Sequence, residues 1–451
     1  MRTLLTAATL LVFAGCDGIV GDMPADEPTA GGNGDGVGGG GQSPTAGGGE
    51  VSTAGGGAAS TAGGSTAGGS TAGGGATAGG STAGGMAATA GGGASANQVP
   101  VFVAVGKQWR RAISCDDGRT WVNDNSVDDA WPVAERYRCF APFTLPDGGA
   151  ANTDCDHNHS TTPALGYANG VFLQQTGWGA PGRIFRSTNG VDWAQVDMGA
   201  NATDVMFDDN RFIIATRSSR RSDDLGATWQ MNGTIDVANG TNTIWNVRGG
   251  IAGGGVYLVT AQDGANLDYA YSSDRGATWR RPTMVGGGRV DVCGAGHPAY
   301  GNGIFVSVTW NQAMNASIIC RSADGAATWS STTLMGEYME SRPLWTGTEF
   351  MVWSNGRVHR SADGITWSSM NTQTRRNGMT SGGPNIGAVA RNANGTFVAT
   401  RGGWQVWYDQ QRFYRSTDGV VWDELATGTY EQGHPITAIA AGFATRSAVC
   451  P

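Results

Sequence analysis

Short apolar stretches separated by polar turns recur along the chain from residue 99 onward. They are rich in Val, Ile and Phe, and this composition together with their length is typical of β-strands. They begin at Val101 (VFVAVG), Val171 (VFLQQTG), Arg211 (RFIIATR), Val256 (VYLVTAQ), Ile304 (IFVSVTW), Glu349 (EFMVWSN) and Thr396 (TFVATRG). Each is followed by a turn and another apolar stretch, as in RIFRS at 183–187. The pattern predicts an all-β domain made of repeats of about 50 residues.

Each repeat also contains a short motif, here called the box, with the consensus SxDxGxTW. Ser and Asp side chains can bind nearby backbone amides, glycine allows positive φ, and tryptophan adds a large apolar side chain, so the motif predicts a hairpin corner over a buried tryptophan. The boxes are Ser114–Trp121, Ser222–Trp229, Ser272–Trp279 and Ser322–Trp329, with shorter forms at Ser187–Trp193, Ser361–Trp367 and Ser416–Trp422. An arginine precedes five boxes, and a residue repeated at one register favours a scaffold role: Arg186, Arg221, Arg321, Arg360 and Arg415.

The box and its spacing resemble the Asp-box, or BNR-repeat, family over about residues 99–451. The resemblance implies a seven-bladed β-propeller of four-stranded blades, with the boxes between the third and fourth strands and the ligand entrance on the opposite face. The same boxes occur in sialidases, in other glycosidases and in propellers without catalytic activity. The resemblance therefore implies a fold but no single activity.

The ends of the repeat region predict how the ring closes. The first repeat begins at Val99 with a second strand, whereas the chain continues past the last box into His434–Gly442 (HPITAIAAG). An open ring would leave a sheet edge unpaired. We therefore expect the C-terminal strand to complete blade 1 as its innermost strand, paired with the strand at Val101.

Six cysteines remain besides Cys16, and an even number in an exported chain predicts three disulfides. Closure of the ring would bring Cys450 close to Cys115. Cys139 would then pair with Cys155, and Cys293 with Cys320. A local pairing of Cys115 with Cys139 is the alternative.

The N-terminal region predicts an exported, anchored protein of the bacterial cell envelope, either periplasmic or on the cell surface. Residues 1–16 (MRTLLTAATLLVFAGC) resemble a lipoprotein signal with lipidation at Cys16, and the alternative is an ordinary secretory signal. Residues 17–98 are rich in Gly, Ala, Ser and Thr and contain TAGG nine times, which predicts a disordered tether, either bare or O-glycosylated. Residues 99–451 form the propeller.

The net charge of the chain is −8, and the sequence contains no stripe of basic residues. Nucleic acid is therefore excluded as a partner, and the only membrane contact that we expect is through the lipid.

Aromatic and histidine side chains gather near the expected entrance. Tryptophans there could stack on sugar rings, although strand-end tryptophans also pack between blades. They are Trp109, Trp178, Trp310, Trp353 and Trp404. Four histidines lie in connections between blades: His157, His159, His297 and His434. The segment DCDHNH at 154–159 matches no standard metal-ligand spacing, so we expect no metal and no cofactor.

Candidate catalytic groups follow from the sialidase resemblance, which implies an arginine triad, an acidic aspartate and a tyrosine activated by glutamate. The best match is EYMESR, which contains Glu337, Tyr338, Glu340 and Arg342, and Asp154 and Asp156 are further acids. No motif for the first arginine occurs near Arg110 and Arg111. We therefore expect a monomeric module that binds a glycan or an envelope protein without catalysis. An exo-glycosidase is the alternative, and a purely structural envelope protein is a third.

Overall fold

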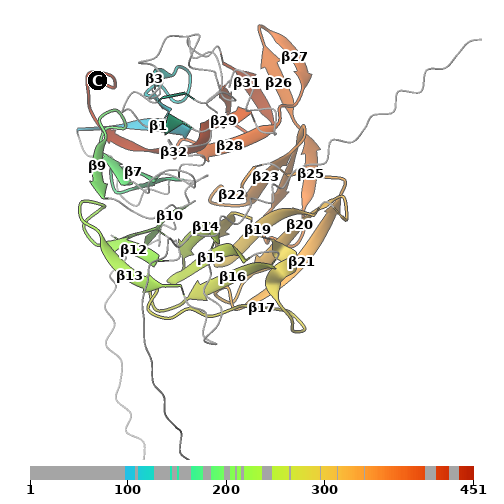
Figure 1. Cartoon of the computed structure of the whole chain (residues 1–451). Coiled ribbons are helices and arrows are strands. Elements are labelled where there is room, and N and C mark those ends of the chain that lie inside the picture. Colours follow the sequence, from blue (N-terminus) through green and yellow to red (C-terminus); the bar gives the residue numbers. More distant parts are fainter. Residues whose placement is uncertain are drawn as a thin grey trace, which may run out of the picture. The chain divides into compact units, whose positions relative to one another are not determined.

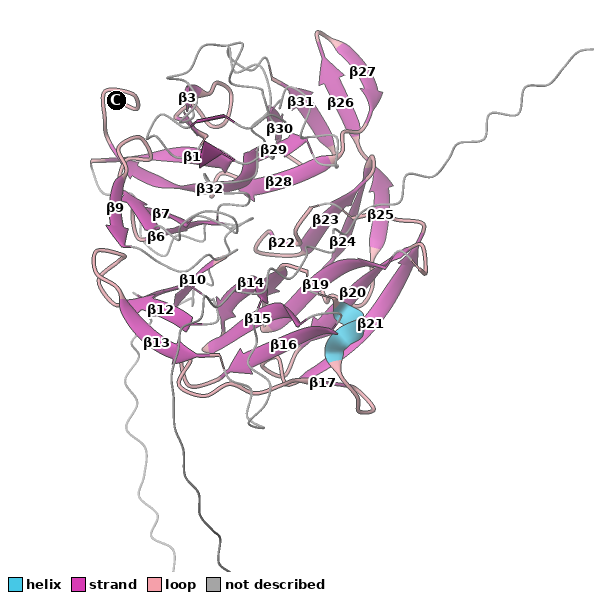
Figure 2. Cartoon of the chain, viewed as in Figure 1, coloured by secondary structure: helices cyan, strands magenta, loops and turns pink. Residues whose placement is uncertain are grey.

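The computed structural model describes sixteen segments of the chain (Figure 1). They are residues 97–106, 110–125, 143–144, 150–151, 164–175, 184–197, 204–208, 211–214, 218–235, 246–263, 266–294, 296–311, 313–339, 341–401, 413–425 and 436–451. Within them the regular structure is β-strand apart from one short 3-10 turn, η3 (Val290–Cys293) (Figure 2). No helix in this part of the chain is long and apolar enough to cross a membrane.

The strands form the seven blades of a β-propeller, which confirms the predicted fold class. From the innermost strand outward, blade 1 is β32 (Ile436–Thr445), β1 (Gln98–Gly106), β2 (Arg111–Ser114) and β3 (Val122–Asn125), and blade 2 is β6 (Ala164–Ala168), β7 (Val171–Gln175), β8 (Ile184–Ser187) and β9 (Ala194–Asp197). Blade 3 is β10 (Val205–Asp208), β11 (Arg211–Ile214), β12 (Ser218–Ser222) and β13 (Gln230–Thr234). Blade 4 has β14 (Asn246–Gly253), β15 (Val256–Asp263) and β16 (Asn266–Ser272), and a single bridge from Tyr271 to Arg280 stands at the place of its fourth strand.

Blades 5 to 7 repeat this order, and blades 5 and 7 carry additional strands. Blade 5 is β18 (Pro298–Gly301), β19 (Ile304–Asn311), β20 (Ala316–Ser322) and β21 (Thr328–Met335), with β17 (Thr283–Met284) on its outer edge. Blade 6 is β22 (Leu344–Trp345), β23 (Phe350–Ser354), β24 (Arg357–Ser361) and β25 (Ser368–Asn371). Blade 7 is β28 (Ile386–Arg391), β29 (Phe397–Arg401), β30 (Phe413–Ser416) and β31 (Val421–Glu424), extended by β26 (Gln373–Arg376) and β27 (Met379–Gly382). A separate pair, β4 (Phe143–Thr144) and β5 (Ala150–Ala151), lies in the insertion after β3.

The core consists of apolar layers between neighbouring blades. Every apolar stretch predicted from the sequence is the second strand of its blade. The first strands of successive blades contact one another in the series β28, β32, β6, β10, β14, β18 and β22, which makes them the innermost strands. Between blades 1 and 2, for example, Val103 and Ile113 pack with Leu165 and Phe172. The repeated strands therefore bury one blade against the next.

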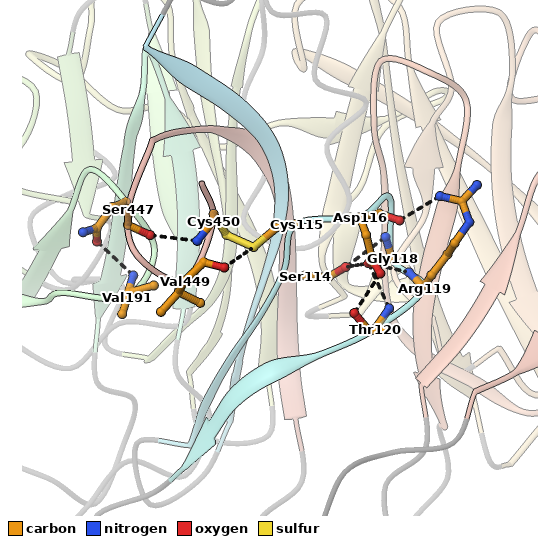
Figure 3. Close-up of a disulfide and its surroundings, with 11 residues drawn as sticks. Ser114, Cys115, Asp116, Gly118, Arg119, Thr120, Val191, Ser447, Val449 and Cys450 are labelled. Atoms are coloured by element: carbon orange, nitrogen blue, oxygen red, sulfur yellow. Dashed lines mark hydrogen bonds between the residues drawn. A yellow bond between two sulfur atoms is a disulfide. The ribbon is translucent and has the colours of Figure 1, made fainter.

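The C-terminal strand closes the ring as predicted. β32 pairs antiparallel with β1 from Gln98–Thr445 to Gly106–Ile436, so it extends to Thr445, beyond the predicted end at Gly442. A disulfide joins Cys115, the second residue of the first box, to Cys450, as Figure 3 shows. Another joins Cys293 to Cys320. Both pairings were predicted, and the third predicted pair, Cys139 with Cys155, lies outside the described residues.

The boxes form the predicted corners. In the first box the Ser114 hydroxyl accepts the Gly118 amide at 3.0 Å, and Asp116 accepts the Ser114 hydroxyl and the Thr120 amide, both at 2.9 Å (Figure 3). Gly118 has φ of 80°, a value that glycine adopts without strain. The serine and aspartate thus replace the backbone ladder where the chain reverses.

The expectation of a buried tryptophan in every box is wrong for four of the seven boxes. Trp279, Trp329 and Trp422 are buried. The other four are half-buried, because they pack against the rim of an inter-blade core and keep part of the ring in solvent: Trp121, Trp193, Trp229 and Trp367.

Four of the five arginines before the boxes join neighbouring blades, which confirms their scaffold role, whereas Arg221 contacts Asn232 and Asp223 of its own blade. In four cases the guanidinium donates to a backbone oxygen in the box of the next blade. The pairs are Arg186 to Leu225 at 2.9 Å, Arg321 to Asp363 at 2.6 Å, Arg360 to Asp418 at 2.5 Å and Arg415 to Asp117 at 2.8 Å. Because Arg415 bridges blade 7 to blade 1, the same contact also stabilises the closure.

Candidate functional site

The strand order determines which segments share one face of the propeller. Antiparallel strands reverse at each hairpin, so the hairpins between second and third strands lie on the face opposite the boxes. The connections that lead from one blade into the first strand of the next lie on that same side. We call this side the entrance face.

One cluster at the entrance face, the axial cluster, is built by the innermost strands of four successive blades. Asp204 directly precedes β10, Gly250 lies in β14, and His297 and Arg342 come shortly before β18 and β22. The Asp204 carboxylate accepts hydrogen bonds from Arg342 Nη1 at 2.5 Å, His297 Nδ1 at 3.0 Å and the Gly250 amide at 2.8 Å. Residues up to 138 positions apart in the sequence therefore meet at one carboxylate.

Asp204 is a buried charge that its partners keep ionised. Burial by itself would raise the pKa of Asp204, but the charges of Arg342 and His297 and their hydrogen bonds outweigh it and hold the pKa below its ordinary value. Because the acceptor is a carboxylate, the proton of the His297 ring that faces it sits on Nδ1. Asp204 thus fixes the orientation of the His297 ring and keeps a proton on its Nδ1 atom.

Gly249 makes room for this cluster. A Cβ atom at Gly249 would lie 3.0 Å from His297 Nδ1 and 3.2 Å from Asp204 Oδ2. Such distances are too short for a relaxed contact, so any side chain there would force the two groups to move. The glycine therefore permits strand β14 to approach the ion pair closely.

A second cluster lies on the connection from blade 5 to blade 6, residues 336–342, which we call the strap. The Ser317 hydroxyl in β20 donates to the Glu337 carbonyl at 2.5 Å and accepts the Met339 amide at 3.2 Å. Ser317 is the register partner of Trp310 in β19. This anchoring holds Tyr338 against Trp310, with ring centroids 5.1 Å apart and an interplanar angle of 81°. Tyr338 remains 46% exposed, so the pair is an aromatic surface on the entrance face.

Side chains of blade 6 bind the Glu337 carboxylate. It forms an ion pair with Arg357 and accepts the Ser354 hydroxyl at 2.8 Å, and His359 Nε2 lies 3.6 Å away. Burial is the main cause that lowers the pKa of His359, and it outweighs the opposing effect of Glu337, so the imidazole is neutral at pH 7. Ser369 lies 2.6 Å from His359 Nδ1.

These groups do not form a nucleophilic triad. Ser354 lies 3.0 Å from His359 Nε2, but the acid lies on that same side of the ring instead of binding Nδ1. Ser354 is also only 2% exposed, which keeps its hydroxyl from a substrate. The cluster is therefore a means of fixing Glu337 and Arg357.

The structure gathers predicted site residues in two groups. Glu337 and Tyr338 lie on the strap with Trp310 of β19 against Tyr338, whereas His297 and Arg342 meet at Asp204 in the axial cluster. Trp353 is fully buried and donates to the Gly419 carbonyl at 2.8 Å, so it packs inside the core instead of lining the entrance. The other candidates lie outside the described residues: Cys16, Trp109, Asp154, Asp156, His157, His159, Trp178, Glu340, Trp404 and His434.

Sequence reasoning missed three of the residues that organise these clusters, namely Asp204, Ser354 and Arg357. One signal was available for Asp204, because it occupies the same place before an inner strand as His297 does. No local pattern distinguishes Ser354 or Arg357, since their role depends on a connection that comes from another blade.

Fold and clusters together define a closed seven-bladed β-propeller with polar groups on its entrance face. No protein-family model matches the sequence, and no curated protein matches it. Among solved structures, the GH74 xyloglucanase from Xanthomonas campestris is similar with a TM-score of 0.45 and 12% identity, covering 76% of this chain and 55% of that one. YCF48 from Cyanidioschyzon merolae is similar with a TM-score of 0.40 and 12% identity, covering 60% of this chain and 90% of that one.

Proposed function

We propose that the chain is a binding module of the bacterial cell envelope, tethered through Cys16, that holds a glycan at its entrance face without hydrolysing it. The observation that carries the proposal is the edge-to-face pair of Trp310 in β19 with the exposed Tyr338 of the strap. Aromatic faces pack against the apolar faces of sugar rings, and the rigid pair loses little conformational entropy on binding. The resemblance of the boxes to the Asp-box family, in which sugar ligands are common, supports the same ligand class.

The state of the acids supports binding over hydrolysis. Most glycosidases require two carboxyl groups, one as acid and one as base or nucleophile, on either side of the scissile bond, and sialidases use an acid with a tyrosine that a glutamate activates. Glu337 is occupied by Arg357 and Ser354, and Asp204 is buried under Arg342 and His297. Each of these carboxylates has a structural partner that a catalytic role would have to displace.

The N-terminus and the disulfides support the proposed localisation in the cell envelope. A signal-like start and a Gly-rich tether favour export, and two disulfides in the described residues fit an oxidising compartment. Cys16→Ser should move the protein from the detergent phase to the aqueous phase after export. Equal partitioning of the parent and the variant would contradict the lipid anchor.

Binding is tested with the full chain in mild detergent on an array of bacterial and extracellular glycans. Tyr338→Ala should weaken binding of any glycan found at least tenfold, which corresponds to about 1.4 kcal/mol. Met335→Ala, which removes an exposed side chain at the end of β21, is the matched control and should bind as the parent does.

Two outcomes would overturn the proposal. One is the absence of any glycan ligand on the array. The other is release of free sugar from a bound glycan by the parent but not by Glu337→Gln, because such a result would establish the exo-glycosidase alternative.

A further inference from the structure

Two consecutive arginines at the start of β2 are paired in different ways. Arg110, only 1% exposed, forms a two-pronged ion pair with Asp124, in which Nε and Nη2 each lie 2.7 Å from a carboxylate oxygen. Arg111 projects to the other side of the sheet, into the interface between blades 1 and 2. There its Nε donates to the Gln174 side-chain oxygen at 2.7 Å. The first arginine is therefore neutralised by a carboxylate, whereas the second meets a neutral amide.

Aromatic rings surround the Arg111 guanidinium. Its central carbon lies 5.0 Å from the centre of the Phe185 ring and 4.7 Å from that of Trp193. Such rings attract a cation through their electron-rich faces, but they carry no net charge. Burial lowers the pKa of Arg111 to about 10, so the side chain is still protonated at neutral pH. A full positive charge thus lies between two blades.

Neighbouring donors at this place lack acceptors. Among the described residues, Arg111 has no ion pair, and its Nη2 atom is buried without a hydrogen-bond partner. The Nε2 atom of Gln174, a residue with 0% exposure, is also buried without one. Leaving a buried charge and a buried amide unpaired costs several kcal/mol in general, and buried cations in proteins are normally compensated by an anion.

We propose that this place is a binding site for a small monovalent anion, such as chloride or formate, held by Arg111 Nη2 and Gln174 Nε2 between blades 1 and 2. The anion supplies the charge and the acceptor that both groups lack. Both donors are closed off from solvent, so an acidic group on a bulky glycan does not reach them. The site is independent of glycan binding at the strap.

The first test measures thermal unfolding of the full chain at increasing sodium chloride, with sodium gluconate keeping the ionic strength constant. Gluconate is too large for a site of this kind. A ligand that binds only the folded state stabilises it in proportion to the logarithm of its concentration above Kd. The unfolding midpoint should therefore rise with chloride, and formate should have the same effect. Crystals grown in bromide should show an anomalous signal next to Arg111 Nη2.

Gln174→Glu places a carboxylate at the same position and should replace the anion. We expect a higher midpoint than that of the parent in gluconate alone, and loss of the chloride response. Gln195→Glu adds the same charge at an exposed position of β9 and should keep the parent's response. Should Gln174→Glu fail to fold, Arg111→Met, which removes the cation, should also lose the response. A parent midpoint that ignores chloride, or equal responses in the parent and Gln174→Glu, would overturn the proposal.

Discussion

The disulfide that closes the ring should contribute more to stability than the disulfide within the ring. Cys115 and Cys450 are 335 residues apart, whereas Cys293 and Cys320 are 27 residues apart. A crosslink reduces the entropy of the unfolded chain by an amount that grows with the logarithm of the loop it closes. That relation gives roughly 6 kcal/mol for the closing bridge and roughly 3.5 kcal/mol for the inner one. The difference, about 2 kcal/mol, is the testable quantity.

Two double variants measure this difference. Cys115→Ala with Cys450→Ala removes the closing bridge, and Cys293→Ala with Cys320→Ala is the matched control with the same chemical change. Alanine avoids placing a hydroxyl in these positions, of which Cys293, Cys320 and Cys450 are fully buried. Equilibrium unfolding in urea, followed by tryptophan fluorescence, gives the free energy of unfolding of each variant.

The expected result is a larger loss of stability for the closing pair. Pairing of β32 with β1 and the contact from Arg415 to Asp117 remain in that variant, so the ring should still close and the protein should still fold. Equal losses, or a larger loss for the inner pair, would contradict the entropy argument. Hydrogen exchange along β32 would then show whether native contacts instead dominate the effect.

Further predictions concern the tryptophans, the axial cluster and the boxes. Trp329→Ala, at a fully buried site, should cost about 3–5 kcal/mol in urea unfolding, and the half-buried Trp229→Ala should cost clearly less; equal costs would argue against burial as the cause. Asp204→Ala should cost about 2–4 kcal/mol, because it removes the buried carboxylate that Arg342 and His297 share, although their partial exposure lets water compensate; an unchanged free energy of unfolding would mean that the ion pairs add nothing. Hydrogen bonds from Thr228 and Ser222 lower the pKa of Asp224 to about 2 in the folded state, below its value in the unfolded chain, so this stabilisation is present above about pH 4 and is lost as the pH falls toward 2. In thermal unfolding, Asp224→Asn should reduce the loss of stability over that range, and an unchanged pH dependence would count against the role of this carboxylate.

The sequence determined the repeats, their number and the closure of the ring. These features depend on local signals, since a second strand and a box each carry their own pattern of apolar and turn-forming residues. A closed propeller requires the C-terminal strand to complete blade 1. The pairing of Cys115 with Cys450 could be predicted because this position brings Cys450 close to Cys115. Burial of the box tryptophans was only partly predictable, because it depends on how the neighbouring blade covers each ring.

Only the tertiary structure decided which polar groups meet. Asp204, His297 and Arg342 come from separate blades, and no spacing along the chain predicts that they meet at one carboxylate. Trp310 and Tyr338 were predicted separately, but their contact depends on Ser317, which anchors the strap to blade 5. A periodic sequence specifies each blade by local propensity and patterning, whereas a site between blades is specified by side chains whose distances are set only when the ring closes.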